Sequence, residues 1–220
     1  MNLKRILGIW VLLLTDPHTC YDDFSKLSWK TLGGFIGSTL VISYLILILG
    51  ANNFFFRNIF YVWKPDLYLI GAVSVLLKYS IFLAMAAIST AVIMTCSKIA
   101  GVRYDWKSAL FSMVIVSCFL YLIYILFSYV FLAFLGKLLF EPKNPAGIKS
   151  TIYGILLAFS LAITSFPSLF PLYAYFYSEN QKMALTHRLF IVLALIIAFS
   201  FLYWPLLEIL WYQTGFTIII

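Results

Sequence analysis

The chain has 220 residues, of which 64% are hydrophobic and 10% are charged, and its formal net charge at pH 7 is +7. Soluble domains carry about a quarter of their residues as charged side chains, so this composition excludes the ordinary soluble classes. The chain therefore needs a lipid bilayer as its solvent, and its basic loops match the anionic lipid of a membrane surface. Because lipid accounts for the positive charge, we expect no nucleic-acid partner.

A short apolar run from Ile6 to Leu14 follows the pair Lys4-Arg5 near the N-terminus. This layout is similar to a secretory signal, but Thr15-Asp16-Pro17 stands where the small residues of a cleavage site are expected. We therefore predict an uncleaved helix that lies in the membrane interface, with a removable signal as the alternative.

Asp16 and Pro17 have the residue types that begin a helix, Asp16 as the cap and Pro17 at the first helical position. Tyr21, Phe24 and Leu27 follow at a spacing that places them on one helical face. Residues 1–30 are accordingly predicted to form a cytoplasmic, interfacial lead-in, and residues 31–220 the transmembrane domain.

Five long apolar segments fill the rest of the chain, and each reaches the about 20 residues that a membrane-spanning helix requires. The alternating pattern of barrel strands is absent, and continuous helices hide every backbone polar group from lipid. The sequence therefore predicts an all-α, polytopic membrane protein with five transmembrane helices. They lie at about residues 32–49, 67–97, 108–136, 151–177 and 189–211.

Lysines and arginines are distributed unevenly between the two sides that five spans create. Nine lie on the side of the N-terminus and five on the opposite side. The positive-inside rule therefore predicts a cytoplasmic N-terminus and a C-terminus outside. Five of the six tryptophans also fall at predicted span boundaries, where indole rings prefer to lie.

Lys78 is the most unusual residue, because it lies inside the second apolar segment. An ammonium at the bilayer centre costs about 3 kcal/mol or more, so there it would mark a functional site. The segment is longer than one crossing requires, however, and its membrane part can begin near Val75. We therefore predict that Lys78 lies near the outer interface and extends outward. Glu208 is the only carboxylate in a predicted span and so its one available partner.

The fourth apolar segment contains Ser165, Pro167, Ser168 and Pro171. Each proline removes a helical hydrogen bond, so the helix is expected to bend or break there. Broken spans build substrate sites in transporters, which makes a site at Ser165 and Ser168 one interpretation. The other interpretation, which we favour, is a simple kink in a packed helix.

Small residues follow helical spacing at the start of the first predicted span, where Gly33 and Gly37 form a GxxxG pattern. Such a surface lets two helix backbones approach closely. We expect it to pack within the chain, with a homo-oligomer as the alternative.

No motif for catalysis stands out, because the chain lacks the nucleophile, zinc-protease and phosphate-loop patterns. His18, Cys20, Asp22 and Asp23 have side chains that can bind metals, but no second anchored pair accompanies them. We therefore predict neither an enzyme nor a metal site, and no cofactor.

Two stretches resemble the Yip family of Rab-interacting membrane proteins, particularly its small prokaryotic members. The first is Leu14-Thr15-Asp16-Pro17 followed by Tyr21-Asp22-Asp23-Phe24, ahead of five spans. The second runs from Ser97 to Val102 and from Tyr104 to Leu110. The resemblance implies a non-enzymatic membrane protein that organises partners or lipids.

The expected function is therefore that of a scaffold or interaction partner in membrane organisation or trafficking. A transporter, permease or channel component with a site near the fourth span is the first alternative. An accessory subunit of a larger membrane complex is the second. In each case the partners are the lipid bilayer and either another membrane protein or further copies of the chain.

Overall fold

The computed structural model describes residues 3–16, 21, 24, 26–51, 65–102, 105–139 and 169–213, and all structural statements below refer to these residues. Every regular element in this part of the chain is helical, which confirms the all-α prediction. The helices are α1 (Leu3–Thr15), α3 (Trp29–Ala51), α5 (Pro65–Ile99), α6 (Trp106–Leu139), α8 (Leu169–Asn180) and α9 (Leu185–Gln213).

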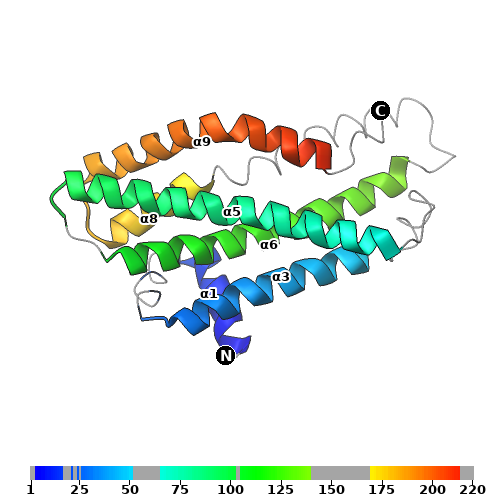
Figure 1. Ribbon diagram of the computed structural model, residues 1–220. Coiled ribbons are helices and arrows are strands. Elements are labelled where there is room, and N and C mark those ends of the chain that lie inside the picture. Colours follow the sequence, from blue (N-terminus) through cyan, green and yellow to red (C-terminus); the bar gives the residue numbers. More distant parts are fainter. Residues whose placement is uncertain are drawn as a thin grey trace.

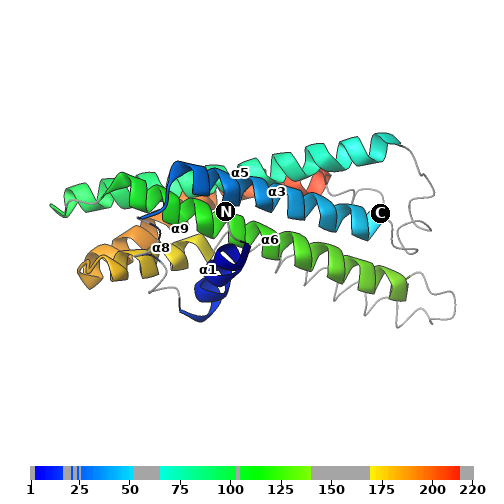
Figure 2. The ribbon, with the colours of Figure 1, turned by 90° about the horizontal axis from the view of Figure 1, so that it is seen from below.

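The long helices α3, α5, α6 and α9 run alongside one another and alternate in direction (Figures 1 and 2). The starts of α3, α6 and α9 and the ends of α5 and α8 therefore meet at one end of the bundle, on the left in Figure 1. We call this end the loop end. It gathers the last residues of the lead-in, at the start of α3, and the turns after α5 and α8, all of which belong to segments predicted to be cytoplasmic.

Three of the helices are long and apolar enough to span a membrane, over Trp29–Ile46, Val75–Ile99 and Trp106–Leu126. They coincide with the first three predicted spans, and two of them begin at a tryptophan. The fifth predicted span lies in α9, whose stretch Leu185–Phe201 is a shorter apolar helix. Most of the fourth lies outside the described residues, so the number of five spans stays a prediction.

Short polar contacts set the helix boundaries at the loop end. Helix α3 begins where the Thr31 amide donates to Ser28 Oγ at 3.2 Å, and α6 where the Lys107 amide donates to Asp105 Oδ1 at 3.1 Å. Helix α5 ends at Ile99. Gly101, two residues later, has a φ of 69° that favours glycine, and the Val102 amide donates to the Ser97 carbonyl at 3.0 Å.

The core is centred on α6, in which residues 111–121 are buried on every side. Helix α5 contacts α6, α9, α3 and α8 through a stripe that repeats every three or four residues, including Tyr79, Phe82, Met85 and Ile93. Helix α3 buries one narrow face and leaves Val41 and Leu45 exposed. The three candidate spans thus differ greatly in how much protein surrounds them.

Helix α1 runs across the long helices rather than along them, as the two views show (Figures 1 and 2). Its Ile9 and Leu13 are buried, Trp10 lies edge-on to Phe35 of α3 at 6.4 Å, and Val11 is exposed. A crosswise direction is the one expected of a helix in the membrane plane, and the interfacial placement stays a prediction.

Candidate functional site

Lys78 lies on the buried face of α5, and its side chain is only 6% exposed. Phe82 and Met85, about one and two turns further along the helix, are also buried, so Lys78 belongs to the face of α5 that points into the protein. Among the described residues no carboxylate forms an ion pair with it; the one described pair joins Arg188 Nη1 and Glu179 Oε1 at 2.6 Å. Lys78 is therefore a covered cation.

This burial corrects one part of the prediction for Lys78. Lys78 lies within the candidate span Val75–Ile99, in the first half of helix α5. The side chain, however, does not extend outward along an exposed surface, because α5 turns this position toward the other helices. Its depth in the membrane stays a prediction, and the side chain of Glu208 lies outside what the structure describes.

Hydroxyl and thiol groups form a second buried cluster close to Lys78 in sequence. Tyr79 Oη and Cys118 Sγ are 3.0 Å apart and share a hydrogen bond between α5 and α6. Tyr121 donates its hydroxyl hydrogen to the Val75 carbonyl at 2.8 Å, and its ring lies 4.9 Å from that of Tyr79. These contacts satisfy polar groups that lipid or an apolar core cannot.

Sequence reasoning missed this cluster, because tyrosines and a lone cysteine within apolar segments are ordinary core residues. The helical spacing of Val75 and Tyr79 was the available signal. It shows that the two share a face but does not identify Cys118 and Tyr121 as the residues opposite them.

Of the four candidate site residues in the predicted fourth span, the structure describes Pro171 alone. Pro171 is buried in the first turn of α8, where a helix tolerates proline because the first amides need no helical acceptor. Ser165, Pro167 and Ser168 lie outside the described residues. The bend at Pro167 and the hydroxyl contacts of the two serines stay predictions.

Gly33 and Gly37 lie on the exposed side of α3, and a Cβ added at either would meet nothing within 4 Å. Packing of this GxxxG pattern within the chain was the favoured expectation. No described residue packs against the two glycines, and packing against the rest of the chain stays a prediction. The face is open to lipid or to another molecule.

Asp16 directly follows α1, and its amide donates to the Leu12 carbonyl at 2.7 Å. The cap that Asp16 was predicted to form for a following helix involves Pro17 and its successors, which lie outside the described residues. The same holds for His18, Cys20, Asp22 and Asp23. In the described ranges no group of three or more His, Cys, Asp or Glu side chains is placed to hold a metal ion.

Tyr21 and Phe24 of the lead-in are completely buried against the loop end of the bundle. Tyr21 donates its hydroxyl hydrogen to the Tyr173 carbonyl of α8 at 3.0 Å, and its ring meets that of Tyr177 at 5.4 Å. Tyr177 in turn donates to Ser108 Oγ of α6 at 3.4 Å. The lead-in is thus fixed to two helices that lie far from it in sequence.

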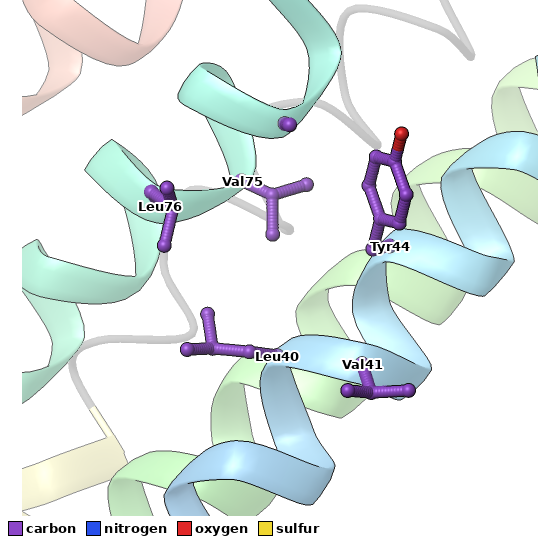
Figure 3. Close-up of a pocket in the computed structure, with 6 residues that line it drawn as sticks. Leu40, Val41, Tyr44, Val75 and Leu76 are labelled. Atoms are coloured by element: carbon purple, nitrogen blue, oxygen red, sulfur yellow. The ribbon is translucent and has the colours of Figure 1, made fainter. Parts of the chain in front are cut away.

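A pocket of about 240 Å³ lies between α3 and α5, lined by Leu40, Val41, Tyr44, Ala72, Val75 and Leu76 (Figure 3). Its lining is apolar apart from the Tyr44 hydroxyl, which points away from Leu40 and Val41. Lys78 is not part of the lining, so this pocket does not join the covered cation to a polar space.

Comparison with family models, with curated proteins and with solved structures found no match for this chain.

Proposed function

We propose that this chain is a five-span integral membrane protein that serves as a non-enzymatic scaffold at its loop end, as the resemblance to the Yip family implies. The observation that carries the proposal is the burial of Tyr21 and Phe24, which fixes the lead-in to α8. A fixed lead-in turns the loop end into one surface rather than a set of independent segments.

The charges at the loop end support a role in contacts with other molecules. Lys98 at the end of α5 and Lys182 in the turn after α8 are exposed. Lys182 has a φ of 56°, and its amide donates to the Glu179 carbonyl at 2.8 Å, so a defined turn presents this side chain. Basic side chains on ordered turns suit an acidic partner at the cytoplasmic membrane surface.

Site-specific photo-crosslinking in intact membranes tests this proposal. We expect a crosslinker at Lys98 and one at Lys182 to label the same partner, because both positions belong to one surface. A crosslinker at Leu45, which is exposed on α3 toward the opposite end, is the matched control and should label lipid. Labelling at the loop end that survives Tyr21→Ala unchanged would contradict a role for the fixed lead-in.

A transport function is the second candidate, and the covered ammonium of Lys78 favours it. A carrier needs a water-filled path to such a charge. Thiol labelling can detect such a path. Cysteines placed at Ser165 and Ser168 should react with a water-soluble maleimide in a transporter and stay unreactive in a scaffold. Thr186→Cys, at an exposed position at the start of α9, supplies the reactive control.

A further inference from the structure

The starts of α3 and α6 carry the same short pattern, a capping residue followed by tryptophan, lysine and a small hydroxyl residue. In α3 it reads Ser28-Trp29-Lys30-Thr31, and in α6 it reads Asp105-Trp106-Lys107-Ser108. Because both helices begin at the loop end, the fold brings the two copies side by side. The sequence separates them by 77 residues, from Trp29 to Trp106.

The two indole rings are in contact and both are exposed. Their centroids are 6.0 Å apart, and Trp29 and Trp106 are 52% and 55% exposed. Large aromatic residues with a polar N–H prefer the boundary between water and hydrocarbon to either phase alone. Two exposed indoles in contact therefore mark the depth at which lipid headgroups meet the bundle.

A buried ring places a cation beside these indoles. The Phe111 ring, which is fully buried, meets the Trp29 ring edge-on at 4.7 Å and carries Lys107 Nζ at 5.3 Å from its centroid. The buried Phe111 ring thus contacts both the Lys107 ammonium and the Trp29 indole. Lys30 is exposed directly after Trp29 and adds a second positive charge.

One carboxylate lies at the same place. Asp105 Oδ1 accepts the Lys107 amide at 3.1 Å, so this acidic group serves the start of α6. Among the described residues at this place, the two lysines outnumber this carboxylate. We call Trp29, Lys30, Trp106 and Lys107 the tryptophan–lysine patch.

We infer that the tryptophan–lysine patch is a binding site for an anionic phospholipid of the adjoining leaflet. The indoles lie between headgroup and acyl chain, and the ammonium groups of Lys107 and Lys30 bind the phosphate region by charge attraction. A zwitterionic lipid offers the same acyl chains without the net negative charge, so the patch prefers the anionic class. This inference does not depend on the scaffold function.

Lipid binding to the full chain, reconstituted in nanodiscs of phosphatidylcholine with a minor fraction of phosphatidylglycerol, tests the inference. Lys107→Gln should weaken retention of phosphatidylglycerol about fivefold, as measured by native mass spectrometry. Lys182→Gln removes the same charge at the same end, away from the indoles, and should change retention less than about twofold. Equal losses in the two variants would show a general attraction to basic loops and overturn the assigned site.

Fluorescence gives a second measurement that does not depend on mass spectrometry. The double variant Trp29→Phe, Trp106→Phe lacks both indoles of the patch. Subtracting its emission from that of the wild-type protein leaves the emission of these two indoles. Brominated phosphatidylglycerol should quench this emission more strongly than brominated phosphatidylcholine, and Lys107→Gln should remove the difference. Equal quenching by the two lipids in wild type would overturn the inference.

Discussion

Helices α3 and α6 are both apolar candidate spans, yet they have opposite surroundings. Residues 111–121 of α6 are buried on every side, whereas α3 presents Val41, Leu45, Gly33 and Gly37 to the exterior. Hydrophobicity therefore reports that a helix belongs in the membrane and not whether protein or lipid surrounds it. In a bilayer both surroundings are apolar, so the sequence is under little pressure to distinguish them.

The two helices also differ in the partners of some polar side chains. In α6, Tyr121 and Cys118 bond to α5. In α3 the described hydroxyl bonds of Ser38 and Thr39 return to the Phe35 carbonyl of the same helix, at 3.0 Å and 2.8 Å. Burial alone does not produce bonds between helices, because Ser112 of α6 is fully buried and donates to the Ser108 carbonyl of its own helix at 2.8 Å.

The largest expected effect comes from truncating Tyr121 in α6. Tyr121→Ala removes a fully buried ring and its bond to Val75, and should lower the free energy of unfolding by about 3 kcal/mol or more. Equilibrium unfolding in mixed micelles measures this loss of unfolding free energy. Val41→Ala on α3, at an exposed position, should cost under about 0.5 kcal/mol. Similar costs at both sites would break the comparison between the helices.

Replacing the covered cation should have a smaller effect of opposite sign. Lys78→Met keeps the length of the side chain and removes the cost of holding an ammonium away from water, so it should raise stability by about 2 kcal/mol. Lys30→Met, at an exposed position in α3, is the matched control and should be nearly neutral. A severe loss of folding in Lys78→Met would show a buried anionic partner and return Lys78 to the leading functional residue.

Removing one hydroxyl should have an intermediate effect. Tyr21→Phe keeps the buried ring and deletes the bond to the Tyr173 carbonyl, which should cost about 1 kcal/mol and speed proteolysis of the lead-in. The control is Tyr44→Phe on α3, whose hydroxyl has no hydrogen bond within the described part of the chain; it should be silent. A silent Tyr21→Phe would mean that ring packing alone fixes the lead-in.

The smallest expected effect is a gain on α3. Gly37→Ala adds a methyl group that meets nothing and improves helix propensity, so stability should rise by up to about 1 kcal/mol. Size-exclusion chromatography of Gly37→Leu distinguishes whether lipid or a second copy of the chain covers this face. An unchanged elution volume indicates lipid, and loss of a larger species indicates that copies of the chain meet there.

The amino-acid sequence by itself determined the class of protein and the positions of its helices. Composition predicted a membrane protein, and span length predicted α3, α5 and α6 within a few residues, because apolar length is a local property of the chain. Helical spacing also predicted that Tyr21, Phe24 and Leu27 share one face, and the structure buries all three.

Only the tertiary structure decided which faces meet. In the structure Lys78 is buried, Gly33 and Gly37 are exposed, and the Trp29 ring contacts that of Trp106. Each outcome depends on how helices distant in sequence are rotated about their axes, and periodicity within one helix does not define that rotation. In lipid the apolar pattern adds little further guidance, because every face of a span is apolar, and packing contacts set the rotation instead.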